Sequence, residues 1–145
     1  MILLDANLLV YAYTPESPRQ EAASTWLQEM LDDTSKVGLP WPTLLAFARL
    51  MGNPSVVSKP VPLNQAWAQV KRWLNLPQTW IPLPTDRHLA IISGLLDEES
   101  KPDLAADAHL AALAIEHGLM LCSTDGDFAR FRGVRWENPL AVGGR

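Results

Sequence analysis

Cysteine is nearly absent from this chain, which has Cys122 alone among 145 residues. An intrachain disulfide is therefore impossible, and so is a zinc or iron–sulfur site built from several cysteines. Long hydrophobic runs are also missing. The longest apolar stretch, residues 105–123, is interrupted by two acidic residues and two histidines, so it does not predict a membrane span. No basic region precedes the apolar residues at the N-terminus, so we expect no signal peptide. These absences predict a soluble, cytoplasmic protein without a membrane partner.

Charge is scarce as well, and its balance is acidic. Charged residues are 19% of the chain, and 12 Lys and Arg against 16 Asp and Glu give a net charge of −4. Such a chain is not expected to coat nucleic acid through bulk attraction, so a polyanionic partner would need a local basic patch or a metal. No glycine-rich phosphate-binding loop is present. With 48% hydrophobic residues, the chain suffices for one domain, residues 1–145, with its own core.

Short apolar segments alternate with longer amphipathic ones. The predicted strands lie at residues 1–4, 37–39, 79–83 and 119–122, with a last small strand within 128–136. Helices are expected at residues 5–13, 18–31, 41–51, 63–74, 85–96 and 103–117. Ser17, Thr85 and Asp103 are the expected N-caps, and Gly118 fits the left-handed position that ends a helix. Strands of about four residues alternating with helices of about twelve indicate an α/β fold with a central parallel sheet covered on both faces.

Acidic residues follow two of the predicted strands. Asp5 comes directly after the first strand, and Asp125 and Asp127 follow the strand at 119–122. Asp107 lies near the start of the helix that precedes that strand. Because ligands bind outside the carboxyl ends of the strands in such sheets, three parts of the chain deliver carboxylates to one edge. Clustered carboxylates repel one another unless a cation lies between them. Oxygen ligands without a Cys or His cluster favour Mg²⁺ or Mn²⁺, which act on phosphates.

Each of these acids also has a purely structural interpretation. Asp5 is suited to bond the amides of a local turn, and Asp107 is suited to face the helix dipole from the first turn. Asp125 and Asp127 flank a glycine in a sequence typical of any loop. Asp103 shares a helix face with Asp107, but we expect it to act as the N-cap. The hypothesis of a metal site rests on the convergence of the acids rather than on any one of them.

The polar neighbours of the acids leave two interpretations open. Asn7 could orient Asp5 or a bound water, or it could cap the helix that follows. Ser123 and Thr124 could bind phosphate or a metal-bound water, or they could satisfy the backbone of their own loop. His109 and His117, on the same helix as Asp107, are expected to be structural.

Basic and aromatic residues are unevenly distributed. Arg130, Arg132 and Arg135 lie just beyond the second pair of acids. They could hold a phosphate backbone, or they could serve only solubility and ion pairing. The chain also has six tryptophans, which we expect in helix packing or at an interface, where Trp is enriched.

Four segments of the chain together resemble the PIN-domain family, specifically the VapC-type toxin ribonucleases of toxin–antitoxin systems. The segments are residues 2–9, which contain Asp5 and Asn7, and residues 107–118, 123–128 and 131–140. They occur in the family's order and spacing, and the resemblance covers essentially the whole chain.

The resemblance implies a three-layer α/β/α sandwich with a mostly parallel sheet, and Mg²⁺-dependent endonucleolytic cleavage of RNA. It also implies a homodimer and a cognate VapB-like antitoxin. By the same resemblance Asp5, Asp107 and Asp125 form the catalytic metal cluster, and Asp127 is a further ligand. The candidate substrate contacts beside this cluster are Asn7, Ser123, Thr124, Arg130 and Arg132.

One position departs from the family pattern and keeps alternatives open. A glutamate is common on the helix after the second strand, but Ala46 stands there. The site could therefore hold one metal ion or two. A first alternative is a PIN-like domain that binds RNA or a partner with weak or no catalysis. A second is a receiver-type protein or small phosphatase phosphorylated on Asp5, but such proteins need a lysine after a late strand, and residues 123–127 include none.

Overall fold

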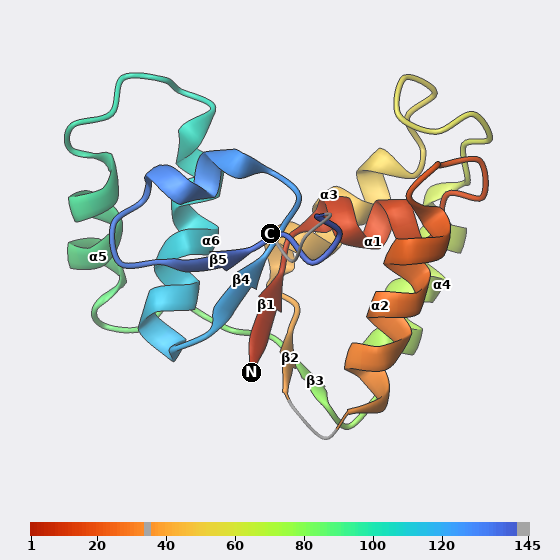
Figure 1. Cartoon of the computed structure of the whole chain (residues 1–145), viewed down its shortest axis with the longest axis horizontal. Helices are drawn as coiled ribbons and strands as arrows, with labels where there is room; N and C mark the ends of the chain where they lie inside the picture. Colours follow the sequence, from red (N-terminus) through yellow and green to blue (C-terminus); the bar gives the residue numbers. More distant parts are fainter. Residues whose placement is uncertain (34–35, 142–145) are drawn as a thin grey trace.

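The computed structural model describes residues 1–33 and 36–141, and a five-stranded parallel sheet runs through the centre of this part of the chain (Figure 1). The strands are β1 (Ile2–Leu4), β2 (Val37–Gly38), β3 (Thr79–Trp80), β4 (Met120–Cys122) and β5 (Arg135–Glu137). Their order is β3-β2-β1-β4-β5, and every pairing is parallel. The carboxyl ends of the strands therefore share one edge, with β1 at its middle.

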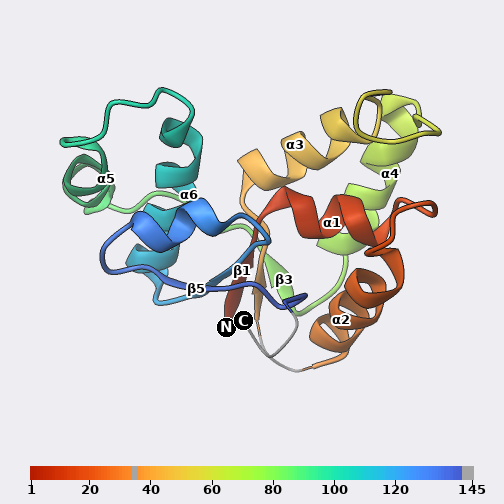
Figure 2. The same ribbon diagram turned by 45° about the horizontal axis from the view of Figure 1, so that its top comes forward.

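Within the described residues, six α-helices and one 3-10 helix connect the strands. They are α1 (Ala6–Ala12), α2 (Gln20–Asp32), α3 (Trp41–Leu50), α4 (Leu63–Leu74), α5 (His88–Leu96), α6 (Leu104–His117) and η1 (Gly126–Arg130). Figures 1 and 2 show α1 to α4 on one side of the sheet and α5 and α6 on the other. The fold is therefore a three-layer α/β/α sandwich, which confirms the fold class predicted from the sequence. No helix in the described ranges is long and apolar enough to cross a membrane.

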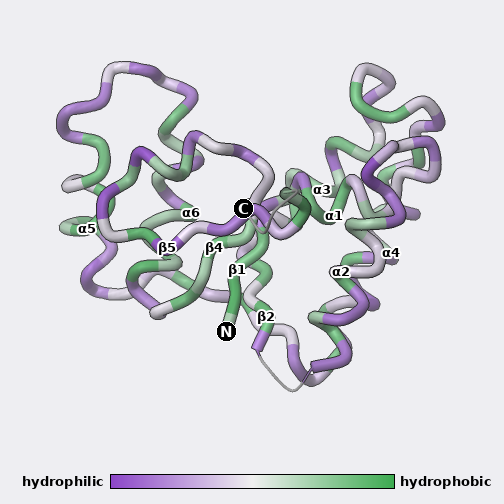
Figure 3. The backbone as a smooth tube through the Cα atoms, viewed as in Figure 1, coloured by the Kyte–Doolittle hydropathy of each residue, from purple (hydrophilic) through white to green (hydrophobic). Residues whose placement is uncertain are grey.

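Each face of the sheet has its own hydrophobic core, because successive side chains of a strand point to opposite faces. Leu4 and Cys122 pack with residues of α1 to α4 on one face. Leu3 and Leu121 pack with α6 on the other face. The apolar colouring of β1 in Figure 3 reflects this burial on both sides. The two cores fix β1 and β4, and thereby the polar residues that follow them.

The helices on the first face match the sequence prediction closely except at the start of α2. α3 and α4 begin at the predicted residues 41 and 63, and α4 also ends as predicted. The prediction that Ser17 caps α2 is wrong. The Ser17 hydroxyl accepts a hydrogen bond from the N–H of Arg19 at 3.1 Å in a local turn, and the helix starts only at Gln20.

Of two further predicted N-caps, Thr85 is wrong, and Asp103 has the predicted position without the capping hydrogen bond. α5 begins at His88 rather than Thr85, because the Thr85 hydroxyl donates to Glu116 on α6 at 2.7 Å. Asp103 precedes α6, but its side chain makes no capping hydrogen bond. The end of α6 does agree with the prediction, since Gly118 adopts a left-handed conformation with φ of 66°.

The edge strand β3 and its neighbour β2 are shorter than predicted. Prolines at 40, 82 and 84 follow them, and proline cannot donate to a strand ladder. Gly38 lies so close to Pro82 that a Cβ on Gly38 would be 2.8 Å from the proline Cγ. A glycine at this position therefore permits the tight approach of the segment that follows β3.

Candidate metal centre

The carboxyl edge of the sheet brings together the segments that follow β1 and β4. Leu4 pairs with Cys122 in the register of the two strands. The N–H of Asp5 donates to the carbonyl of Cys122 at 3.0 Å. Asp5 therefore lies directly beside Ser123, the first residue after β4. The two loops that were expected to carry acids are neighbours in space.

Both carboxylate oxygens of Asp5 accept hydrogen bonds. Oδ1 accepts from the N–H of Ala6 at 2.7 Å and so caps α1, while Oδ2 accepts from the Ser123 hydroxyl at 2.8 Å. Burial raises the pKa of Asp5, the bonds from Ser123 and Ala6 lower it, and the charge of Asp125 raises it, with a net increase. Asp5 thus has the structural role of an N-cap and also belongs to the electrostatic field of the other acids.

Asp107, near the start of α6, meets the two acids that follow β4. One carboxylate oxygen of each of Asp107, Asp125 and Asp127 lies within 4.8 Å of the others. Burial, first, and the charges of Asp125 and three other aspartates together raise the pKa of Asp107 to about 6. The negative charges of these carboxylates therefore repel one another, and a cation bound between them would relieve the repulsion.

A hydrogen-bond network connects the two loops. The Asn7 amide donates to Ser123 Oγ at 3.1 Å and lies 3.5 Å from Asp5 Oδ2. Asn7 Oδ1 accepts from the N–H of Thr124 at 3.4 Å, and Ser123 Oγ accepts from the N–H of Asp125 at 3.0 Å. Ser123 has no exposed surface, so its hydroxyl orients the acids in this structure. Asn7 and Thr124 are only partly buried and remain accessible to a substrate.

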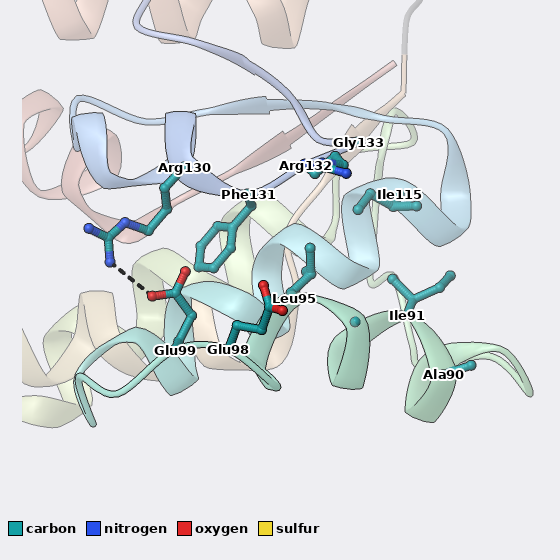
Figure 4. A pocket seen from close by; sticks show the side chains of 11 residues that line it. Ala90, Ile91, Leu95, Glu98, Glu99, Ile115, Arg130, Phe131, Arg132 and Gly133 are labelled. Atoms are coloured by element: carbon teal, nitrogen blue, oxygen red, sulfur yellow. Dashed lines mark hydrogen bonds and ion pairs between the residues drawn. The ribbon is translucent and has the colours of Figure 1, made fainter.

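Two of the three arginines beyond these loops, Arg130 and Arg135, have partners within the protein. Arg130 Nη1 lies 3.4 Å from Glu99 Oε1 of the segment between α5 and α6, an ion pair drawn in Figure 4. Arg130 and Arg132 line a pocket of about 500 Å³ between η1 and α5. Arg135 donates to the carbonyl of Gly118 at 2.9 Å. An exposed ion pair contributes roughly 1 kcal/mol or less, so a phosphate group could replace Glu99 at Arg130.

The contact between α5 and α6 contains a polar cluster that no sequence motif indicates. Buried Glu116 accepts hydrogen bonds from the N–H and the hydroxyl of Thr85, each at 2.7 Å, and from Nδ1 of His88. His88 Nε2 lies 3.1 Å from Nδ1 of His109. Burial raises the pKa of Glu116, but the bonds from Thr85 and His88 bring it below its ordinary value. His109 is therefore engaged in helix packing, in agreement with its structural interpretation.

Helix α3, where many PIN-like sequences carry a glutamate, is hydrogen-bonded to the same edge of the sheet. The buried Thr43 hydroxyl donates to the carbonyl of Leu4 at 2.7 Å, which places the first turn of α3 beside the end of β1. Ala46 is the next residue on this side of the helix after one turn, and its methyl group offers no ligand atom. α3 contains no acidic residue, so it adds no carboxylate to the cluster.

Comparison with known proteins decides the family. Residues 2–134 match the family model described as PIN domain. The chain is 40% identical over 143 residues to Ribonuclease VapC37 of Mycobacterium tuberculosis, a match that covers 98% of this chain and 99% of that protein. The chain belongs to the PIN-domain family. A second PIN-domain relative, Ribonuclease VapC33 of the same species, is 37% identical over 141 residues, with 97% of this chain and 99% of that protein covered.

Solved structures agree with a PIN-domain fold. VapBC2 from Rickettsia felis, crystallised with a DNA fragment from its promoter, contains a chain with a TM-score of 0.66 and 16% identity, covering 95% of this chain and 98% of that one. FitAcB from Neisseria gonorrhoeae contains a chain with a TM-score of 0.66 and 22% identity, covering 98% of this chain and 100% of that one. At these identities the likeness establishes the fold alone.

The donor set of this PIN domain fits a hard divalent cation. The clustered side chains offer carboxylate oxygens, the ligands that Mg²⁺ and Mn²⁺ prefer, and no thiolate lies among them. Membership in the family also removes the receiver-type alternative. The lysine that a receiver-type protein needs after a late strand is also missing from residues 123–127.

Proposed function

We propose that this PIN domain, one unit spanning residues 1–145, is a Mg²⁺-dependent endoribonuclease and the toxin of a toxin–antitoxin module. The observation that carries the proposal is the meeting of the Asp107, Asp125 and Asp127 carboxylates within 4.8 Å, at the sheet edge that Asp5 also enters. Two relatives that match nearly the whole chain are named ribonucleases, which supports RNA as the substrate. Mn²⁺, with similar ligand preferences, is the expected substitute for Mg²⁺.

The proposed mechanism assigns a distinct task to each acid. Bound Mg²⁺ would supply charge neutralisation at the phosphate and a water of lowered pKa. Asp5, oriented by Ala6 and Ser123, and Asp107 are the proposed principal ligands, with Asp127 in a supporting position. Asp125 holds the N–H of Asp127 at 2.9 Å with its Oδ1. Its other oxygen, Oδ2, is the group we assign to orient or deprotonate the attacking water.

Contacts to the RNA are proposed for the polar residues around the acids. Asn7 and Thr124 border the acids and are partly exposed. Arg132 is exposed, and among the described residues Arg130 pairs with Glu99 alone, so both arginines would be available to phosphates of the strand. Ser123, which is fully buried, contributes by keeping Asp5 and Asp125 in position.

A homodimer and an antitoxin are the proposed partners, and the cytoplasm is the proposed compartment. The sequence of α5 is strongly apolar, yet none of its residues is buried in the single chain, and Leu89 is 77% exposed. A second copy covering α5 would remove this apolar surface from water. A structural neighbour of the chain is VapBC2 from Rickettsia felis bound to promoter DNA, which supports a cognate VapB-like antitoxin for this chain.

A catalytically weak, RNA-binding or partner-binding domain is the second candidate, because Ala46 leaves the cluster without a ligand from α3. One experiment separates the two functions. The purified protein is incubated with a mixed RNA substrate in the presence of Mg²⁺ or Mn²⁺, with and without a chelator. We expect cleavage that the chelator stops and that added antitoxin suppresses. Binding of RNA without cleavage under every metal condition would favour the second candidate.

A further inference from the structure

Trp41 is the most exposed of the six tryptophans, all of which lie in the described part of the chain. Its exposed fraction is 42%, whereas Trp73 is 2% exposed and the other four are partly buried. Trp41 begins α3 between Pro40 and Pro42, and the fixed φ angles of the two prolines restrict the backbone around it. The indole therefore presents a flat apolar face to solvent, which is available for stacking.

The register of the sheet places Trp41 at the edge that carries the acids. Leu3 pairs with Gly38, so the segment after β2 leaves the sheet beside the segment after β1. The bond from Thr43 to the carbonyl of Leu4 fixes the first turn of α3 there. Asp5 hydrogen-bonds to Ser123 on its other side. Asp5 consequently lies between the start of α3 and the loop that carries Asp125 and Asp127. Figure 2 shows the starts of α1 and α3 side by side at the end of β1.

The exposed face of α3 suits a polyanion with flat apolar groups. Trp41, Leu45 and Arg49 follow one another at a spacing of four residues, so they share a helix face. Leu45 is 57% exposed and Arg49 is exposed as well. Arg49 is the only charged residue on α3, and it forms no ion pair with any residue in the described ranges. Proteins that bind single strands combine aromatic side chains, on which bases stack, with cations that contact the phosphates. This face of α3 offers one group of each kind.

We propose that the exposed face of α3 binds a stretch of the single-stranded RNA that leads to the cleaved phosphate, with Trp41 stacking on an unpaired base and Arg49 contacting the backbone. This inference rests on the proposed function and names the part of the chain that positions its substrate. Stacking on an aromatic side chain accepts any base, so Trp41 contributes affinity and alignment of the strand rather than sequence preference. The acids would then act on a phosphate held at a fixed offset from the stacked base.

Intrinsic fluorescence provides the test. Wild type, Trp41→Ala, Trp41→Phe and the control Trp26→Phe are titrated with a short single-stranded oligoadenylate in chelator, so that no cleavage occurs. We expect quenching in wild type and in Trp26→Phe, and loss of that quenching in both Trp41 variants. Anisotropy with a labelled oligonucleotide should show affinity about tenfold lower in Trp41→Ala, with partial recovery in Trp41→Phe. Arg49→Gln should weaken binding and reduce its salt dependence.

Cleavage and sedimentation separate the possible failures. If wild type cleaves RNA and Trp41→Ala retains wild-type affinity and kcat/KM, the stacking role is refuted while the proposed function stands. If Trp41→Ala instead dissociates a dimer without changing the RNA affinity of the monomer, the α3 face belongs to a second copy and the inference is also refuted. If wild type binds oligoadenylate through Trp41 but cleaves no RNA with any metal, the inference stands and the nuclease proposal fails.

Discussion

At the scale of single residues, Asp107 is where the charges of the acidic cluster converge. It is only partly buried, yet burial and four neighbouring aspartates together raise its pKa from 3.8 to about 6. The folded protein without metal therefore holds a proton on Asp107 that the unfolded chain has already released. This preference makes the stability of the metal-free protein depend on pH.

The stability of the metal-free protein should fall as pH rises from 3.8 to about 6, and then level off. Asp107→Asn should flatten this decline and stabilise the protein near neutral pH by on the order of 1 kcal/mol, since solvent screens a partly exposed group. Urea unfolding in chelator at a series of pH values measures the effect. Asp86→Asn, an exposed position on another loop, is the matched control. An unchanged pH profile in Asp107→Asn would show that the acids do not interact as described.

Much of the candidate site could be predicted at this scale, because Asp5, Asp125 and Asp127 follow strand ends and Asp107 belongs to a short motif on α6. The sequence did not indicate that Asp5 would have both of its possible roles at once. A carboxylate has two oxygens, and one caps α1 while the other contacts Ser123. His88 was missed because its partner Glu116 is 28 residues away in sequence and His88 itself belongs to no local pattern. For Arg130 the sequence left a phosphate contact and an ion pair both open, and its pairing with Glu99 depends on the path of the segment between α5 and α6.

At the scale of elements, the predicted helix boundaries agree with the structure in some helices and not in others. The predicted starts of α3 and α4 are correct, and a proline lies at the start of each. The predicted start of α5 is wrong, because the residue expected to cap it has another partner. That residue is Thr85, and Glu116 accepts from both its N–H and its hydroxyl. α5 has no buried residue of its own, so its position depends on α6 and on this polar cluster.

Glu116→Gln should loosen α5 and destabilise the protein by on the order of 2 kcal/mol, because hydrogen bonds to a buried charged group weaken. Hydrogen exchange should accelerate in α5 while β1 and β4 remain protected. The pKa of Glu116 is lowered by folding, so its stabilising effect is present above the ordinary value of 4.5 and is lost as pH falls through the folded-state pKa. The variant should lack that acid-dependent loss. Glu98→Gln, an exposed position beyond α5, should behave as wild type, and equal exchange in both variants would refute the role of the cluster.

The absence of a carboxylate from α3 should weaken metal binding to the free protein. Two unit charges 4 Å apart interact by about 4 kcal/mol at an effective dielectric of 20. Even a fraction of this energy, from one additional carboxylate, would change the metal affinity measurably. Ala46→Glu should increase Mn²⁺ affinity about tenfold or more in calorimetric titration without RNA. Leu45→Glu, one residue away on the solvent side of the helix, is the control and should have little effect. Equal affinities in wild type and Ala46→Glu would mean that residue 46 does not face the acids.

At the scale of the whole molecule, the two halves of the sandwich have different tasks. The α1–α4 side holds the larger core, and the α5–α6 side supplies Asp107 together with an uncovered apolar helix. The acids lie between the two sides, at the end of the central strand. The order of the layers could be predicted from the alternation of strands and helices. The exposure of α5 could not, because periodicity indicates that a face is apolar but not what covers it.

Leu89→Lys should shift the protein from dimer to monomer, because it places a charge in the apolar surface of α5 that a second copy is proposed to cover. Sedimentation at micromolar concentration measures the change. Leu63→Lys on α4, where the leucine is 66% exposed, is the matched control and should leave the dimer intact. A wild-type protein that sediments as a monomer, or a Leu89→Lys variant that remains dimeric, would contradict this interface.

The most direct test of the account is the rate of RNA cleavage by wild type, Asp5→Asn, Asp107→Asn and Asp125→Asn, each assayed in Mg²⁺ and in chelator. Replacing a carboxylate by an amide keeps the shape and removes the charge, so each variant should fold at least as stably as wild type. We expect metal-dependent cleavage by wild type and at least about a hundredfold lower rates in all three variants. Cleavage by Asp5→Asn at the wild-type rate, or wild-type activity that survives the chelator, would contradict a metal site at this edge of the sheet.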